Sequence, residues 1–315
     1  MRRVDHIDWL ETFVAVVDHG GFSAAADAVH RSQSRVSAHV ASLEHALGAC
    51  LFDRRHRPVA LTDAGEAFLS HARAVLTQLD LGQSDVDGVL GLTRGHVVLG
   101  SYPSASAAFV PTVLRSFRRH CPDVRVDLVE QPTLDLAGSL AAGEVQLALR
   151  PRIPHPRAAG IRSRSLWREW LVAVVPRDHP LAAAPEPVQL PLIAGYPVIT
   201  IGRPRPDAPV MYEAHEAFRR AGLEPHIAWQ TDQPQTLASL VRAELGVGVT
   251  NELAAEVSET SALVVRRLAD LGQGREVAVF WDDRRHQSVA ARALLREIVA
   301  TSVPAGTVPP ARGGG

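Results

Sequence analysis

The segment from Phe22 to Glu44, FSAAADAVHRSQSRVSAHVASLE, constrains the fold most, because it predicts two short helices joined by a tight turn. Ser23 can cap the first helix and Ser32 the second, which places the turn at about His30 to Arg31. An apolar stripe at helical spacing follows the second helix, formed by Val36, Val40 and Leu43. Two helices that pack by such a stripe and keep a polar outer face have the shape of a helix-turn-helix.

The outer face of the second helix is small and polar, counting about 100° per residue. Gln and Ser hydrogen-bond base edges in a major groove, and Arg binds guanine or phosphate, so we expect this face to contact DNA. The candidate residues are Ser23, at the start of the first helix, and Ser32, Gln33, Ser34, Arg35, Ser37, Ala38 and His39, at and on the second. His39 lies at the flank of the helix, where a phosphate contact would make binding mildly pH dependent. An ordinary surface helical hairpin has the same turn pattern and is the alternative.

A basic turn follows in Leu51 to Thr62, LFDRRHRPVALT, before a short strand-like Val59 to Leu61. Its cations, Arg54, Arg55 and Arg57, predict a wing that contacts phosphates or the minor groove. The stretch from Arg31 to Arg57 contains five arginines and two carboxylates, so its net charge is +3. A solvated arginine face is the alternative for this charge run.

The order of these elements resembles the LysR-type transcriptional regulators. The matching pieces are Leu10-Glu11-Thr12-Phe13-Val14, Gly21-Phe22-Ser23, Ala25-Ala26, Ser32-Gln33-Ser34, Val36-Ser37, Leu43-Glu44, Leu47-Gly48, Leu51-Phe52, Leu61-Thr62 and Ala64-Gly65. The resemblance implies that Gln33, Ser34 and Ser37 face base edges and that Arg54 and Arg57 hold the DNA backbone. Ala38 stands where the family often has Arg, and we expect Arg35 to compensate from the neighbouring turn.

The whole-chain composition gives no sign of nucleic acid, since the net charge is −1 and the pI is about 6.9. The DNA-binding signal is therefore local to the N-terminal segment. Cys50 and Cys121 fall in different predicted domains, so we expect no disulfide. The N-terminal sequence lacks the apolar region of a secretory signal, and no run of about 18 apolar residues exists, so we expect a cytoplasmic protein.

Residues 63–92 predict one long linker helix after the DNA-binding domain of residues 1–62. A helix of roughly 40 Å must bury its apolar stripe, and a second copy of itself is the natural partner, although packing on its own chain is the alternative. Gly82, Gly88 and Gly91 weaken its C-terminal half. The resemblance implies a dimer through this helix, often a tetramer, and hence a pseudo-palindromic operator.

Residues 93–300 alternate between strand and helix patterns, which predicts an α/β architecture with helices on both faces of its sheets. We expect two lobes, one formed by about 93–162 with 267–300 and the other by about 163–266, joined by two crossings and separated by a cleft. This layout resembles the family's effector-binding domain, which is similar to periplasmic solute-binding proteins. Gln146 and Asn251 depart from the acidic residue and the proline that are frequent there. The Pro- and Gly-rich residues 301–315 predict a disordered tail.

Ligands of open α/β sheets bind at loops beyond the carboxyl ends of strands. This rule selects loops near 101–106, 131–133, 200–205 and 231–236, and the strand end at Thr250. Hydroxyls at helix starts in these loops favour anions, so we expect a small anionic or polar effector. Helix capping is the alternative role of the same hydroxyls. The candidate effector-binding residues are Ser101, Ser104, Ser106, Gln131, Thr133, Thr200, Arg203, Asp232 and Thr250.

Catalysis is the competing class of function, but the sequence has no Gly-x-Ser-x-Gly, His-Glu-x-x-His or phosphate-loop motif. Its histidines lack metal-ligand spacing, so we expect no cofactor and no metal. The sequence thus predicts a DNA-binding transcriptional regulator controlled by a small effector, with RNA polymerase as a further partner. Two alternatives are a solute-binding protein or enzyme that uses the same two-lobed fold, and a constitutive regulator that needs no ligand.

Overall fold

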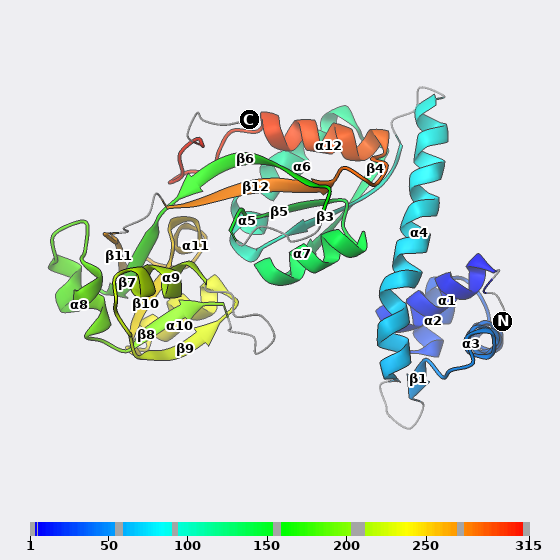
Figure 1. Ribbon diagram of the computed structural model, residues 1–315, viewed down its shortest axis with the longest axis horizontal. Helices are drawn as coiled ribbons and strands as arrows, with labels where there is room; N and C mark the ends of the chain where they lie inside the picture. Colours follow the sequence, from blue (N-terminus) through cyan, green and yellow to red (C-terminus); the bar gives the residue numbers. More distant parts are fainter. Residues whose placement is uncertain are drawn as a thin grey trace. The chain divides into compact units, whose positions relative to one another are not determined.

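The computed structural model describes residues 4, 6–53, 59–89, 94–153, 159–202, 212–269 and 274–310 (Figure 1). Its contacts divide the chain into two compact units. The head unit comprises Met1–His96 with Ala142–Glu144, and the two-lobed unit comprises Val97–Ala141 with Val145–Gly315.

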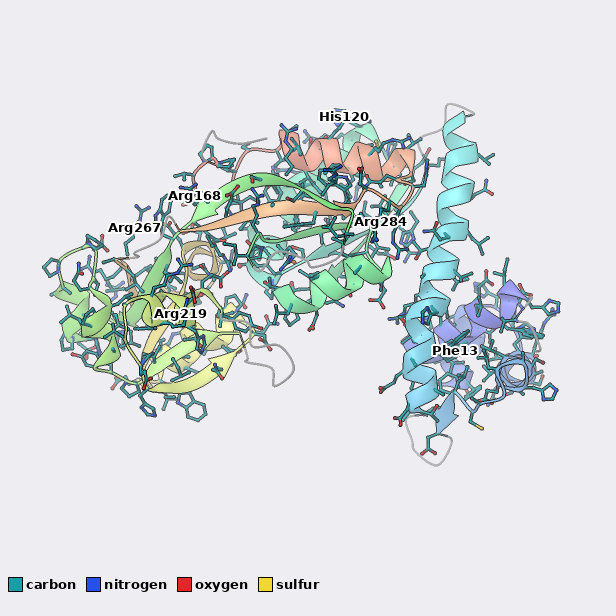
Figure 2. All side chains as sticks on the ribbon, viewed as in Figure 1. Phe13, His120, Arg168, Arg219, Arg267 and Arg284 are labelled. Atoms are coloured by element: carbon teal, nitrogen blue, oxygen red, sulfur yellow. The ribbon has the colours of Figure 1, made fainter. Side chains whose placement is uncertain are left out.

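The head unit is a small helical bundle with a two-stranded wing. Its elements are α1 (Ile7–Asp18), α2 (Phe22–Ala28), α3 (Gln33–Leu47), β1 (Phe52–Asp53) and β2 (Ala60–Leu61), and the two strands pair antiparallel. Phe13 of α1 is fully buried at its centre (Figure 2), with its ring centroid 5.4 Å from that of Phe52 and 5.8 Å from that of Phe68. The predicted stripe of α3 is confirmed, because Val36, Val40 and Leu43 are fully buried.

One of the two predicted helix caps is correct. The Ser32 side chain accepts a hydrogen bond from the Arg35 amide and caps α3, as expected. Ser23 does not cap α2, because the N-cap lies two residues earlier, at Gly21, and the helix begins at Phe22. The ring of Phe22 packs edge-on against Phe52 at 5.5 Å, which draws Phe22 into the helix and leaves Ser23 exposed inside its first turn.

The predicted linker is one continuous helix, α4 (Asp63–Val89), which continues through Gly82. A single glycine costs a helix only about 1 kcal/mol relative to alanine, which is too little to end it. The first half of α4 packs on the head core through Phe68, Ala72 and Leu76. Other apolar side chains of α4 are exposed, namely Val75, Leu79 and Val86.

The first lobe of the two-lobed unit is a mixed five-stranded sheet in the order β4-β3-β5-β12-β6. Its strands are β3 (Gly95–Ser101), β4 (Val124–Glu130), β5 (Leu147–Pro151), β6 (Ile161–Glu169) and β12 (Arg275–Asp282). Its helices are α5 (Pro103–Ala108), α6 (Val110–His120), α7 (Thr133–Ala142) and α12 (Val289–Ala300). Leu147 and Leu149 face the core under α6 and α12, whereas Ala148 faces Leu140 of α7, so helices cover both faces as predicted.

The second lobe is a mixed five-stranded sheet in the order β11-β7-β10-β8-β9. Its strands are β7 (Leu171–Pro176), β8 (Val198–Ile201), β9 (Ile227–Thr231), β10 (Val247–Asn251) and β11 (Leu263–Arg267). Its helices are the short 3-10 turn η1 (Pro180–Ala183), α8 (Leu190–Ala194), α9 (Glu213–Arg220), α10 (Pro234–Arg242) and α11 (Glu252–Glu256). Apolar cores on the two faces join the sheet to α8 and α9 on one side and to α10 and α11 on the other.

The chain passes from the first lobe to the second at Trp170, between β6 and β7, and returns between the end of β11 at Arg267 and the start of β12 at Arg275. The expected boundary near residue 162 is therefore too early. β6 belongs to the first lobe, because it pairs with β12 from Ile161 to Glu169. The second lobe begins after this strand.

The tail was expected to be disordered, but residues 301–310 pack back on the two-lobed unit. Pro304 is buried, and Val308 exchanges two backbone hydrogen bonds with Arg168 of β6, of 2.8 and 3.0 Å. These contacts satisfy the backbone of a segment whose composition alone favours disorder. The last five residues lie outside the described part of the chain. No helix in the described ranges has the length and apolar composition needed to cross a membrane.

Candidate nucleic-acid interface and interlobe pocket

The outer face of α3 presents the residues that the helical spacing placed there. Gln33, Ser34, Arg35 and Ala38 are exposed, and Ser37 is half-buried between them. The Ser32 hydroxyl, besides capping the helix, lies 3.0 Å from the Ser34 hydroxyl. Hydrogen-bonding side chains are therefore held at the start of α3, where a recognition helix meets base edges.

His39 is fixed from behind by the first helix. The Thr12 hydroxyl donates to the Asp8 carbonyl at 2.6 Å and lies 3.0 Å from Nδ1 of His39, which is also 3.4 Å from the Arg31 guanidinium. Arg31 donates to the Asp8 carboxylate at 3.0 Å, and this bond holds the pKa of Asp8 below its usual range. The cluster ties the turn and α3 to the N-terminal end of α1.

The base of the wing is held by backbone contacts. The Glu44 carboxylate accepts from the amides of Leu51 and Phe52 at 2.7 and 3.3 Å. Gly65 lies so close to this segment that an added Cβ would meet the Leu51 carbonyl oxygen at 2.1 Å. The three predicted wing cations, Arg54, Arg55 and Arg57, lie outside the described residues.

The two lobes enclose a pocket with a cavity volume of about 40 Å³. The first lobe contributes Tyr102, Ser104 and Thr133 from the starts of α5 and α7. The second lobe lines it with Tyr212, Glu213, Asp232 and Asn251. Arg275, at the start of β12, completes the lining where the second crossing re-enters the first lobe.

A buried ionic cluster joins the lobes behind this pocket. Arg275 donates to Glu169 at 2.8 Å and to Glu213 at 3.1 Å, and its guanidinium lies 5.0 Å from the Tyr102 ring centroid. Burial opposes the charge of Arg275, but the two carboxylates outweigh burial and raise its pKa. Burial, followed by the Glu169 charge, raises the pKa of Tyr102 well above its ordinary value. Arg275 is thus a cation whose charge is already matched by protein carboxylates.

The structure places three of the expected effector-binding residues at the pocket: Ser104, Thr133 and Asp232. Five others do not line it: Ser101, Ser106, Gln131, Thr200 and Thr250. Ser101 donates to the Tyr102 carbonyl, and Gln131 accepts from Ser139 at 3.0 Å. The hydroxyls of Ser106, Thr200 and Thr250 are buried without a hydrogen-bond partner among the described residues. Arg203 lies outside the described part of the chain.

The sequence rule missed Glu169, Glu213 and Arg275. It was applied to the four loops named above and to Thr250, so it passed over Glu169 at the carboxyl end of β6, whereas Arg275 opens a strand. β12 runs antiparallel to β5, with Val277 opposite Pro151, so its first residues lie at the carboxyl end of β5. Of the two departures from the resemblance, Asn251 lines the pocket, whereas the Gln146 side chain accepts from the Val98 amide at 2.5 Å within the first lobe.

The described residues contain no cluster of three or more His, Cys, Asp or Glu side chains arranged to hold a metal ion. Cys50 and Cys121 are both free thiols, the first exposed and the second buried. The two candidate sites are therefore a hydrogen-bonding helix face and an interlobe pocket, both suited to recognition.

Two family models match the chain. A model described as "Bacterial regulatory helix-turn-helix protein, lysR family" covers residues 7–66, and one for the "LysR substrate binding domain" covers residues 90–302. The nitrogen assimilation regulatory protein nac of Klebsiella aerogenes is 33% identical over 248 residues, 78% of each chain. The uncharacterized regulator YybE of Bacillus subtilis is 26% identical over 296 residues, 93% of this chain and 99% of its own.

Solved structures share the fold. CbnR, a LysR family transcriptional regulator, has a TM-score of 0.70 at 21% identity, covering 93% of this chain and 98% of its own. Full-length CbnR in complex with its target DNA has a TM-score of 0.68 at 21% identity, over the same shares of the two chains. The relatives of this chain are transcriptional regulators, a class of proteins that are not enzymes.

Proposed function

We propose that this chain, which belongs to the LysR family of DNA-binding transcriptional regulators, reads its operator with the exposed face of α3. The observation that carries this proposal is the position of Gln33, Ser34 and Arg35, exposed at the start of a helix whose opposite face is fully buried. An amide and a hydroxyl there match base edges, and an arginine matches guanine or phosphate.

The contacts to DNA divide into two classes. We assign base reading to Gln33, Ser34 and Ser37, and backbone contacts to Arg35, His39 and the wing arginines Arg54, Arg55 and Arg57. Ala38 leaves a gap in the reading face that Arg35 fills from the preceding turn. Ser32 acts by capping α3, and Ser23 contributes at most a phosphate contact from its exposed position.

We further propose that the protein works as a dimer through α4. Val75, Leu79 and Val86 remain exposed along this helix after its first half has packed on the head core. A second copy of α4 would bury these side chains, and a two-fold dimer requires a pseudo-palindromic operator. We include in this proposal that dimers pair into a tetramer and that the protein contacts RNA polymerase. The protein would act in the cytoplasm, where the chromosome lies.

The effector acts through the interlobe pocket in this proposal. Two crossings join the lobes, and an ionic cluster links Glu169 at the first crossing with Arg275 at the second. A ligand that contacts both lobes shifts the population toward one relative lobe placement. In a dimer, such a change in lobe placement would alter how the two DNA-binding heads engage the operator.

Two substitutions test the reading face. Gln33→Ala should reduce discrimination between the operator and competitor DNA by about 1–3 kcal/mol, because one base contact is lost. Arg35→Ala should weaken binding to every fragment and lower the slope of log affinity against log salt by about 1. Fluorescence anisotropy with DNA from upstream of the gene measures both effects.

Arg162→Ala is the matched control, since this arginine is exposed in the two-lobed unit and pairs with Asp283. Its affinity and salt slope should equal those of the unchanged protein. Unchanged binding by both head variants would show that α3 does not read this DNA.

A further inference from the structure

A carboxylate lies among the cations that flank the reading face of α3. Arg31 lies in the turn before α3, Arg35 in its first turn, and His39 one turn further. Asp8, in the first turn of α1, faces this group. The hydrogen bond from Arg31, followed by the charges of Arg31, His39 and Arg35, holds the pKa of Asp8 below its usual range. The flank that would meet DNA phosphates therefore already contains an anion of the protein.

The Arg31 guanidinium is held by this anion at one nitrogen. Its Nη1 donates to the Asp8 carboxylate at 3.0 Å and lies 3.4 Å from Nδ1 of His39. A guanidinium has five N–H donors in one plane, and those on Nε and Nη2 of Arg31 have no acceptor among the described residues. Nε and Nη2 together form a fork that matches two phosphate oxygens. The side chain is 25% exposed, so this fork is open to a ligand.

The backbone fixes Arg31 at the end of α3 that meets DNA. The Arg31 amide donates to the Ala26 carbonyl at 3.0 Å, and the next residue, Ser32, caps α3. His30, on the other side, has a φ of +50° in the left-handed region, which turns the chain sharply before Arg31. Base edges are read from the start of a recognition helix, and phosphates border the groove on both sides of it. Arg31 is therefore placed beside a phosphate rather than over the bases.

We propose that Arg31 binds a backbone phosphate of the operator through Nε and Nη2, and that Asp8 is the residue that positions it by holding Nη1. This inference rests on the proposed function and adds a backbone contact to those assigned above. Asp8 is 50% exposed and repels other phosphates, so DNA gains from Arg31 only where a phosphate meets the open fork. Asp8 thereby favours the operator over other DNA.

Variants of Arg31 test the phosphate contact. Fluorescence anisotropy compares the full-length protein on the upstream fragment that it binds specifically and on a scrambled duplex of the same length. Arg31→Ala should weaken binding to both duplexes and lower the slope of log affinity against log salt by about 1, because one phosphate contact is lost. Arg31→Lys should keep this slope, because the charge remains. It should weaken operator binding at least threefold, because an ammonium has no planar fork to share between a carboxylate and a phosphate.

Asp8→Asn separates positioning from charge. Loss of a negative charge near the phosphates should tighten binding to the scrambled duplex. Operator binding should not tighten with it, because Arg31 has lost its anchor, so the ratio of operator affinity to scrambled-duplex affinity should fall at least threefold. Asp18→Asn is the matched control, because Asp18 is the last residue of the same helix and pairs with Arg73 of α4. It loses the same charge, and its affinity ratio should equal that of the unchanged protein.

The double variant tests whether Asp8 acts through Arg31. In a protein that already carries Arg31→Ala, the further change Asp8→Asn should leave the affinity ratio unchanged, because the side chain that Asp8 positions is gone. Thermal unfolding establishes that each variant is folded before its binding is compared.

A salt slope for Arg31→Ala equal to that of the unchanged protein would overturn the phosphate contact, as would full operator affinity in Arg31→Lys. An affinity ratio for Asp8→Asn equal to that for Asp18→Asn would overturn the positioning role. In each of these cases the unchanged protein still binds its operator specifically, so the proposed function stands. Absence of specific binding by the unchanged protein would instead remove the proposed function itself.

Discussion

Replacing Glu169 by glutamine should destabilise the two-lobed unit by about 3–5 kcal/mol, the cost of breaking a buried ion pair from one side. The Glu169 carboxylate has no solvent exposure and accepts from Arg275 at 2.8 Å, the Leu253 amide at 3.1 Å and the Tyr102 hydroxyl at 3.3 Å. Glutamine removes the charge and adds an NH2 group where three donors already converge. Arg275, 11% exposed, would retain Glu213 as its charged partner among the described residues.

Urea unfolding followed by tryptophan fluorescence measures this loss, because Trp167, Trp170, Trp229 and Trp281 report on the two-lobed unit and only Trp9 lies in the head. For an m-value of about 2 kcal/mol/M, the midpoint should fall by roughly 1.5–2.5 M.

Glu216→Gln, at a partly exposed ion pair on α9, should cost about 1 kcal/mol or less. Glu169→Gln combined with Arg275→Met should recover part of the loss, because the buried guanidinium is then gone and the carboxylate left without it, Glu213, is 26% exposed to solvent. A Glu169→Gln cost no larger than that of Glu216→Gln would refute the reasoning.

Three further changes have defined outcomes. Deleting residues 303–315 removes two backbone hydrogen bonds to β6 and should lower the free energy of unfolding by about 1–3 kcal/mol, whereas deleting only 311–315 should leave the urea midpoint unchanged. Burial lowers the pKa of His215, so the unfolded chain binds its proton more readily than the native chain. Stability should therefore fall as the pH drops below about 6.5, and His215→Gln should flatten this dependence in urea titrations at several pH values. Gly65→Ala should lower the thermal midpoint of the head and its DNA affinity, because the added Cβ would clash with the Leu51 carbonyl. Gly82→Ala, on the same helix, places a Cβ that meets nothing within 4 Å and should stabilise α4 by about 1 kcal/mol. Equal thermal midpoints for the two variants would contradict the steric argument.

The head unit was largely predictable because its signals are local. The stripe of Val36, Val40 and Leu43 and the Ser32 cap both lie within one helix, where 3.6-residue spacing determines the buried face. The failure at Ser23 came from a contact distant in sequence, since the Phe22 ring packs on Phe52, thirty residues away. One long linker helix over residues 63–92 was also predictable from helical periodicity, and α4 spans Asp63–Val89 although its glycines were expected to weaken the C-terminal half.

The interlobe pocket was only partly predictable. Ser104, Thr133 and Asp232 follow strands or begin helices, so the carboxyl-end rule found them. Glu169 and Arg275 lie at the two crossings, and their pairing depends on the antiparallel register of β6 and β12 across more than one hundred residues. The packing of the tail was not predicted for the same reason. Its composition favours disorder, whereas the pairing of Val308 with Arg168 at the edge of β6 is a contact between residues distant in sequence.

The central claim is that the head recognises a specific DNA sequence. Fluorescence anisotropy with DNA upstream of the gene and of neighbouring divergent genes, repeated across salt concentrations, tests it most directly. One fragment should bind well above competitor DNA, with affinity falling steeply as salt rises. Equal, weak binding to all fragments at every salt concentration would contradict it.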